Sequence, residues 1–180
     1  MRFASMRNLD ISNGEGVGVS LFVQGCDRHC FNCFNPDTWN FNGGKEWTEE
    51  AKNKFIKLID RPYINRISVL GGEPLAEQNL DEILSLIKEI RISFPEKTIW
   101  LYTGYELSKI IKQEQHEKVS GIPDVWSKRW EIIKLCNIVV DGEYIDEQKN
   151  LTLKWCGSRN QHVIDVKQSI AQNKMVLYCD

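Results

Sequence analysis

The sequence predicts an α/β protein with a mostly parallel open sheet, or an incomplete (β/α) barrel, of about five to six strands flanked by helices. Segments typical of strands alternate with segments typical of helices, which favours parallel strands joined by helical crossovers. The length of 180 residues suits a single domain over residues 1–180 and is short for a complete eight-unit barrel, which takes about 250 residues. Hydrophobic residues make up 42% of the chain, which is enough for a core and excludes wholesale disorder.

The first half of the chain is expected to form two strands and two helices. Residues 17–24 carry valine or leucine at every second position, which is typical of a strand. Residues 48–60 open with a threonine that can cap a helix and then place apolar residues at helical spacing. A short apolar run at 66–70 predicts a second strand. The strongest helix is expected over 79–91, where Asn79 is predicted to cap an apolar stripe.

The second half continues the same alternation. The strands expected there are 98–102, 137–140 and 161–166. A short helix is expected over 106–113, and a helix with inward-facing tryptophans over 125–135. Between these helices the polar stretch 113–124 contains glycine and proline, and we expect it to form a surface loop.

The charge balance and the lack of long apolar runs narrow the class of protein. The chain has 23 basic and 25 acidic residues and a net charge of -2, so nothing indicates a nucleic acid or an anionic membrane as partner. No apolar run approaches the roughly 20 residues of a membrane span, and residues 1–10 lack a signal-peptide core. We therefore expect a cytoplasmic protein, where thiols stay reduced and six cysteines need an explanation other than disulfides.

Three of the six cysteines lie close together, directly after the first predicted strand. The sequence there reads Cys26-Asp-Arg-His-Cys30-Phe-Asn-Cys33. Three thiolates on one loop can hold a metal centre, and a four-iron cluster normally takes four cysteines. Three cysteines would leave one iron without a protein ligand, and a catalytic cluster needs such an open iron in order to bind its substrate.

Two other chemistries fit the same loop. A zinc site could combine Cys26, Cys30 and Cys33 with His29 or the distant Cys156, although structural zinc sites usually show two separated pairs. A redox dithiol could use Cys30 and Cys33 alone, which leaves Cys26 unexplained. Cysteines without motif spacing are interpreted as small buried residues or free thiols, and these are Cys136, Cys156 and Cys179.

Three further loops at predicted strand ends carry candidate ligand-binding residues. Gly71-Gly72-Glu73-Pro74 follows the second strand, and its two glycines let the backbone approach a ligand without obstruction by Cβ. Thr103-Gly104-Tyr105 follows the third strand and Asp141-Gly142 the fourth, although Asp141 is also typical of a simple turn. Because the carboxyl ends of parallel strands lie on one rim of a sheet, we expect these loops to meet the cysteine loop there.

The cysteine spacing and its flanks resemble those of a known family. The spacing C-x3-C-x2-C resembles the cluster motif of the radical S-adenosylmethionine (SAM) superfamily. The segments 13–16 (NGEG), 22–26 (FVQGC) and 34–39 (FNPDTW) resemble those of the anaerobic (class III) ribonucleotide reductase activating proteins and the related pyruvate formate-lyase activating enzymes. The segment 157–161 (GSRNQ) resembles a stretch near the C-terminal end of the same family.

The resemblance implies a radical SAM-type incomplete barrel and a set of site residues. Cys26, Cys30 and Cys33 would hold three irons of a [4Fe-4S] cluster, and the amino and carboxylate groups of SAM would chelate the fourth. The SAM-binding residues that the resemblance implies are Asn32, Gly71, Gly72, Glu73, Pro74, Thr103, Gly104 and Asp141. Among them, Asn32 would contact the adenine through its backbone, and Glu73 would complement the SAM ammonium group.

The activity that the resemblance implies is the transfer of a radical to a protein. SAM would be cleaved reductively to methionine and a 5′-deoxyadenosyl radical, which would abstract a glycine Cα hydrogen and leave a glycyl radical. The implied partners are the catalytic subunit of an anaerobic ribonucleoside-triphosphate reductase and a one-electron donor such as flavodoxin. Two alternatives stay open, namely activation of another glycyl-radical enzyme of the pyruvate formate-lyase type and a non-catalytic zinc-binding interaction module.

Overall fold

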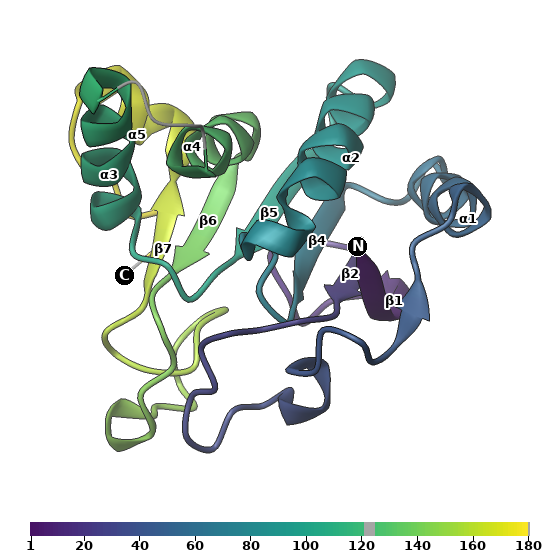
Figure 1. The fold of residues 1–180 in the computed structure, drawn as a ribbon. Helices are drawn as coiled ribbons and strands as arrows, with labels where there is room; N and C mark the ends of the chain where they lie inside the picture. Colours follow the sequence, from purple (N-terminus) through teal and green to yellow (C-terminus); the bar gives the residue numbers. More distant parts are fainter. Residues whose placement is uncertain (121–124, 180) are drawn as a thin grey trace.

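The computed structural model describes residues 1–120 and 125–179, and Figure 1 shows their arrangement. The strands are β1 (Arg2–Asp10), β2 (Gly18–Val23), β3 (Lys45–Glu46), β4 (Arg66–Gly71), β5 (Thr98–Tyr102), β6 (Ile138–Asp141) and β7 (His162–Asp165). The helices are α1 (Glu49–Ile59), α2 (Leu80–Ser93), α3 (Leu107–Ser120), α4 (Val125–Leu135) and α5 (Val166–Gln172). No helix in the described part of the chain is long and apolar enough to cross a membrane.

The strands form one sheet in the order β3-β1-β2-β4-β5-β6-β7. The central strands β2, β4, β5 and β6 are parallel, as the alternation of strands and helices predicts. Strands β1 and β3, which the sequence pattern does not predict, extend the sheet with antiparallel pairing. The expectation that the fifth predicted strand is also parallel is wrong. Strand β7 runs antiparallel to β6 because the described segment 142–161 contains no crossover helix, so the chain returns in the opposite direction.

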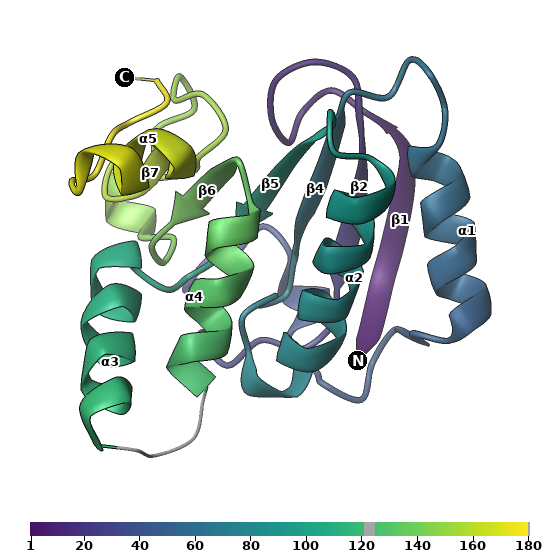
Figure 2. The same cartoon turned by 90° about the horizontal axis from the view of Figure 1, so that it is seen from above.

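The two faces of the sheet are covered differently. Figure 2 shows helices α1, α2 and α4 along one face, where most of the apolar core is buried. The opposite face carries a smaller apolar cluster around Trp100 and Val140. Loops cover that cluster, with the rings of Trp155 and Tyr178 packed edge-on against Trp100 at centroid distances of 5.0 and 5.4 Å. The face covered by loops is the one that can form a ligand cavity.

Helix α3 is longer than the sequence pattern indicates. Residues 113–120 were expected to belong to a surface loop but are helical, and residues 121–124 of that expected loop lie outside the described residues. No glycine or proline interrupts the chain within 113–120. Glu114 is buried and pairs with Lys118 one turn later at 2.5 Å, which supports the extra turns. Polar composition alone therefore misplaces the end of this helix.

The start of α2 differs from its predicted capping. Asn79 stands at the N-cap position, but its side chain makes no capping hydrogen bond. Its Nδ2 instead donates to the backbone oxygens of Gln24 and Glu73 at 3.1 and 3.0 Å. The buried amide thus ties α2 to the loops that follow β2 and β4, both of which carry candidate site residues.

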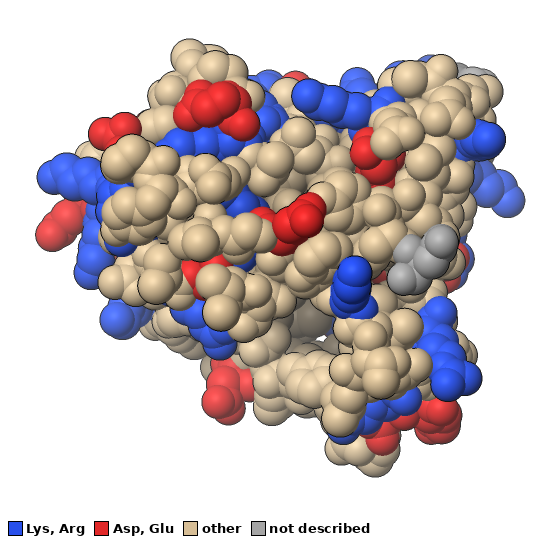
Figure 3. All heavy atoms as spheres, turned by 180° about the vertical axis from the view of Figure 1, so that it is seen from behind, with Lys and Arg blue, Asp and Glu red and all other residues tan. Residues whose placement is uncertain are grey.

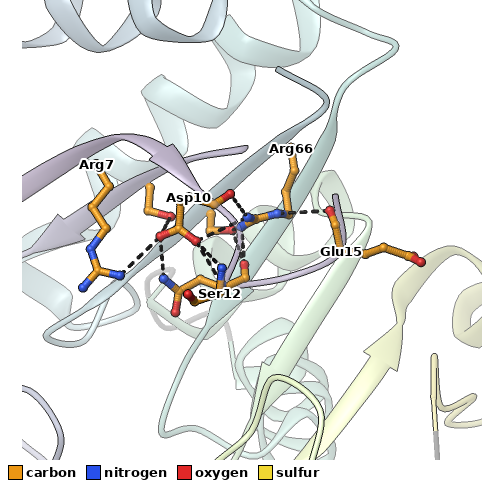
Figure 4. Close-up of polar contacts among 8 residues, drawn as sticks. Arg7, Asp10, Ser12, Glu15 and Arg66 are labelled. Carbon is orange, nitrogen blue, oxygen red and sulfur yellow. Dashed lines mark hydrogen bonds and ion pairs between the residues drawn. The ribbon is translucent and has the colours of Figure 1, made fainter. Parts of the chain in front are cut away.

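A buried network anchors the loop between β1 and β2 to the loop-covered face (Figure 4). Asp10 at the end of β1 and Arg66 at the start of β4 are almost completely buried and form an ion pair at 3.4 Å. Arg66 also donates to the backbone oxygens of Asp10 at 2.7 Å and Glu15 at 3.2 Å. The Asp10 carboxylate accepts from the amides of Ser12 and Asn13 at 2.8 and 2.9 Å. These bonds fix a loop that has little regular structure of its own.

This network predicts a loss of stability in acid. Burial raises the pKa of Asp10, but hydrogen bonds from Asn13, Ser20 and Ser12 outweigh that effect and lower the pKa from 3.8 to about 2. Because the pKa is lower in the folded state, the carboxylate contributes about 2 kcal/mol to the free energy of unfolding above about pH 4 and loses this contribution toward about pH 2. Urea unfolding across this range measures the loss. Asp10→Asn is expected to flatten the profile between these pH values, and an unchanged profile would contradict the assignment.

Candidate metal centre and cofactor pocket

The cysteine loop and the other three candidate loops lie on one rim of the sheet. They follow β2, β4, β5 and β6, which are neighbouring parallel strands whose carboxyl ends share that rim. Figure 1 shows the loops after β2 and β6 side by side at the lower end of the sheet. An ion pair between Arg28 and Glu143 and a hydrogen bond from Asn32 to Asp146, both 2.9 Å long, join these two loops. The predicted meeting of the loops is confirmed.

A cavity of about 420 Å³ opens between the loops. The predicted site residues that line it are Cys26, Cys30, Cys33, Gly71, Gly72, Glu73, Thr103 and Gly104. Three other predicted residues, Asn32, Pro74 and Asp141, are not among the described residues that line this cavity. The predicted residues therefore divide into those that line the cavity and those that lie outside its lining.

The cysteine loop is folded back on itself and pinned at its base. The amides of Gly25 and Cys26 donate to the backbone oxygens of Thr38 and Trp39 at 2.8 and 3.0 Å, which closes the loop. Within it, His29 and Asn32 adopt left-handed backbone conformations, with φ of 49° and 55°. Non-glycine residues rarely adopt such angles, so the loop holds this shape only because its surroundings fix it.

The three thiols are partly buried and lie near backbone N–H groups. Burial raises the pKa of Cys26 to about 11 and also raises that of Cys30, while nearby backbone amides oppose the rise in both. These amides are those of Arg28 and His29 for Cys26, and of Tyr144 and Cys30 itself for Cys30. The amide of Asn35 donates to the Cys33 Sγ at 3.4 Å. Such donors stabilise thiolates, and hydrogen bonds to the sulfurs tune iron–sulfur clusters.

This set of donors fits an iron–sulfur cluster better than a single metal ion. Each cysteine of a four-iron cluster binds a different iron, so the sulfurs need not converge on one point. A zinc ion instead needs four ligand atoms around one point, at about 2.0–2.3 Å. Within residues 1–120 and 125–179, no three His, Cys, Asp or Glu side chains converge in that way. Three thiols free of disulfides on one cavity wall suit a cluster with an open iron.

The glycine pair after β4 allows two backbones to pass in contact. Gly71 has a φ of +107°, and a Cβ on Gly72 would lie 2.4 Å from the carbonyl oxygen of Gly25. The amide of Gly72 donates to the Val23 oxygen at 2.9 Å, and that of Glu73 to the Gly25 oxygen at 2.8 Å. The cysteine loop is therefore seated directly on the Gly-Gly-Glu segment.

Gly72→Ala is expected to displace the cysteine loop. The new Cβ would meet backbone atoms of Gly25 and Thr38, which cannot move aside cheaply, and we expect a loss of about 1–3 kcal/mol in the free energy of unfolding. Gly104→Ala is the matched control, because its Cβ would meet no backbone at close range, only side-chain atoms of Arg28 at 3.0 Å and of Glu73 at 3.4 Å. Urea unfolding of both variants measures the difference. Equal losses would contradict the close seating of the two backbones.

Glu73 is buried beneath the cavity and holds two loops together. Its Oε1 accepts from the Leu75 amide and the Thr103 hydroxyl, and its Oε2 from the Gly104 amide, all at 2.8 Å. Burial raises the pKa of Glu73, while these hydrogen bonds and the charge of Arg28 oppose the rise. A carboxylate offers about four lone-pair positions, so one remains for a ligand in the cavity.

Two predicted residues outside the cavity have partners within the protein. Asp141 is buried, and its Oδ2 accepts from the Leu107 amide at the start of α3 at 2.8 Å. Its Oδ1 contacts the Nδ1 of His162 on β7 at 2.9 Å. The exposed Asn32 uses its side-chain amide on Asp146. Asp141 thus supports the elements that follow the cavity, and only the backbone of Asn32 stays available to a ligand.

Comparison with known proteins decides which family the chain belongs to. Residues 12–164 match the family model described as "4Fe-4S single cluster domain". The chain is 35% identical over 165 residues to the anaerobic ribonucleoside-triphosphate reductase-activating protein of Salmonella typhi, which covers 91% of this chain and 97% of the relative. Proteins of the same name from Escherichia coli K12 and Enterobacteria phage T4 are each 34% identical over 165 residues, covering 97% and 93% of those relatives. The chain belongs to this family of activating proteins.

In this activating-protein fold, several cavity residues escape prediction from the sequence. The additional residues that line the cavity include Arg28, Phe34, Glu143, Tyr144 and Trp155. Arg28 and Phe34 carry a sequence signal, because Arg28 stands between two motif cysteines and Phe34 directly follows the third. The others lie beside polar or apolar neighbours without a motif, and long-range folding alone brings them to the cavity.

The segment 157–161, which resembles a stretch of the activating proteins, closes one side of the cavity. The Oε1 of Gln161 accepts from the amides of Gly157 and Ser158 at 2.9 and 3.2 Å. Its Nε2 donates to the backbone oxygen of Gly142 at 2.9 Å. One glutamine side chain therefore folds this segment onto the loop after β6.

The charged residues seen in Figure 3 are of both signs. Lys and Arg side chains alternate there with Asp and Glu among uncharged residues, and no extended patch of one sign is visible among the described residues of this face. Three of the exposed apolar side chains lie on the loops around the cavity. Phe31, Phe34 and Leu151 are 73%, 60% and 82% exposed, and the last two line the cavity.

Proposed function

We propose that this protein is a radical SAM activating enzyme that installs a glycyl radical on an anaerobic ribonucleoside-triphosphate reductase. The observation that carries the proposal is the shared cavity, which is lined by the C-x3-C-x2-C cysteines and the Gly-Gly-Glu segment in a member of the activating-protein family. Cys26, Cys30 and Cys33 would hold three irons of a [4Fe-4S] cluster, and the fourth iron would take the amino and carboxylate groups of SAM. The sheet would be an incomplete barrel of the radical SAM type.

In this proposal the chain binds and orients its cofactors and excludes water. When bound and reduced by one electron, the cofactors supply methionine and a 5′-deoxyadenosyl radical, which takes a glycine Cα hydrogen and becomes 5′-deoxyadenosine. The backbone of Gly71 and Gly72 allows close approach, and Glu73 offers a negative charge to an ammonium group. The rings of Phe34 and Trp155 line the cavity and help to keep water from the reactive species.

A protein segment suits this site as substrate better than a small molecule does. Exposed apolar side chains beside a cavity mark surfaces that bind other proteins, and Phe31, Phe34 and Leu151 provide such a rim. The relatives are named as activators of anaerobic ribonucleoside-triphosphate reductase, so we propose its catalytic subunit as the partner. A one-electron donor of the flavodoxin type would supply the electron.

Anaerobic reconstitution with iron and sulfide, followed by incubation with reductant, SAM and the catalytic subunit, tests the proposal. We expect a glycyl-radical doublet on the subunit in electron paramagnetic resonance (EPR) and about one 5′-deoxyadenosine per radical. Omission of SAM should abolish both. A radical that forms only on a pyruvate formate-lyase type enzyme would redirect the proposal to that partner, and a zinc protein without SAM chemistry would overturn it.

A further inference from the structure

Arg28 occupies a central place in the cavity that its motif does not explain. It lies between Cys26 and Cys30 and lines the cavity. Its guanidinium stacks on the ring of Tyr105 at 3.8 Å from the ring centroid, and its Nη1 donates to Glu143 Oε1 at 2.9 Å. The stack and the ion pair hold the planar group in one orientation above the loop that follows β5.

One donor of this guanidinium is buried without a hydrogen-bond partner. The Nε of Arg28 has no hydrogen-bond partner in the described structure. In that part of the chain it forms only an ion pair, with the carboxylate oxygen Oδ1 of Asp27 at 3.6 Å. The Nε is closed off from the cavity, and the ion pair with Asp27 partly offsets the cost of its burial. The side chain as a whole lines the cavity and carries further N–H groups besides the one that Glu143 accepts, so a ligand in the cavity can supply an acceptor for them.

The carboxylates of Glu73 and Glu143 both line the cavity beside Arg28, and Glu143 is already paired with Arg28. Glu73 is buried there, and its carboxylate lies close enough to Arg28 for the two charges to influence each other. An α-amino acid group carries one ammonium and one carboxylate. Glu73 therefore suits the ammonium, and the N–H groups of Arg28 that Glu143 does not take suit the carboxylate, since Arg recognises carboxylates with particularly good geometry.

We propose that Arg28 binds the carboxylate of an α-amino acid group in this cavity, while Glu73 faces its ammonium. This inference rests on the proposed function for the identity of the ligand, which is the methionine half of SAM. A carboxylate has two oxygens, so one can bind the open iron while the other accepts from Arg28. In the alternative role, Arg28 only holds the cysteine loop through Glu143.

Binding measurements with two ligands distinguish these roles. Decarboxylated SAM keeps the ammonium and the sulfonium of SAM but lacks the carboxylate. Equilibrium dialysis of both ligands against the reconstituted wild type, Arg28→Gln and Glu143→Gln measures the coupling between Arg28 and the carboxylate. Glu143→Gln tests the alternative role, because it removes the ion pair and leaves the guanidinium held by its stack on Tyr105. Iron content and circular dichroism verify that each variant is folded and loaded.

Arg28→Gln is expected to weaken SAM binding by about 10- to 100-fold, the usual effect of losing a hydrogen bond to a charged group. Its affinity for decarboxylated SAM should stay near that of the wild type. Glu143 lies in the same cavity wall, and Glu143→Gln should weaken the binding of SAM and of decarboxylated SAM to the same extent, by less than Arg28→Gln weakens the binding of SAM, as expected for a half-exposed ion pair. If Arg28→Gln does not bind iron, Arg28→Lys is measured in its place. This variant should show a smaller loss of affinity, and only for SAM.

Three results would overturn the inference. In the first, Arg28→Gln binds SAM as tightly as the wild type does. In the second, Arg28→Gln loses affinity equally for SAM and for decarboxylated SAM. In the third, Glu143→Gln loses as much affinity for SAM as Arg28→Gln does. Each of these leaves the proposed function intact, provided that the wild type binds SAM. A wild type that holds its cluster but binds neither ligand would instead remove the proposed function, and this inference with it.

Discussion

Replacing Cys26, Cys30 or Cys33 singly with serine is expected to abolish cluster assembly, reducing bound iron from about four atoms per chain to well below one. These three thiols line the same cavity, and each would hold a different iron. The loss of any one thiol therefore leaves one iron without its protein ligand. Iron and sulfide analysis after anaerobic reconstitution, together with the visible absorption of the cluster, measures the effect.

Cys156→Ser is the matched control for this prediction. Cys156 lines the same cavity and is partly buried, but it lies outside the motif spacing. The Cys156→Ser variant should therefore keep the full iron content of the wild type. If Cys156→Ser loses its metal as the motif variants do, Cys156 is a fourth protein ligand, and the closed zinc site considered from the sequence becomes the better account. If only Cys30→Ser and Cys33→Ser have an effect, a redox dithiol explains the loop.

Arg66→Met is expected to lower the free energy of unfolding by about 3–5 kcal/mol, because it removes the buried cation that pairs with the buried carboxylate of Asp10. Arg66 is completely buried, and besides Asp10 it contacts the backbone oxygens of Asn13 and Glu15. The same change therefore releases the loop whose residues Ser12 and Asn13 line the cavity. Urea denaturation at neutral pH measures the loss.

Arg7→Met provides the comparison for Arg66→Met. Arg7 pairs with the same Asp10 carboxylate at 3.5 Å, but its side chain is 53% exposed. An exposed pair contributes up to about 1 kcal/mol, so this variant should stay close to the wild type. If Arg7→Met and Arg66→Met cost the same, the buried network does not anchor the loop in the way its geometry indicates.

The sequence predicts the part of the fold in which local pattern and tertiary environment agree. Strands β2, β4, β5 and β6 are buried and parallel, so their apolar runs stand out, and the rim formed by their carboxyl ends follows from topology. Strand β1 is different because most of its residues are exposed or only partly buried and mix polar with apolar side chains. Strand β3 has two residues and becomes a strand only by pairing with β1.

The residues of the candidate site also divide into those that the sequence identifies and those that it does not. The motif cysteines and glycines can be identified from their spacing in the sequence, and they line the cavity. Asp141 carries the same strand-end signal, but its carboxylate is used on Leu107 and His162, which no local pattern reveals. Glu143 follows β6 at the predicted rim, but its ion pair with Arg28, 115 residues away, has no signal in the sequence. Topology predicts that the loops meet, whereas the pairing of individual side chains between them requires the structure.

EPR spectroscopy of the reduced, reconstituted protein with and without SAM tests most directly whether three cysteines hold a four-iron cluster whose open iron faces a SAM cavity. We predict a [4Fe-4S]+ signal whose shape changes when SAM is added, because SAM then becomes a ligand of that iron. A cluster signal that SAM leaves unchanged, or a cluster-free protein with stoichiometric zinc, would contradict the account.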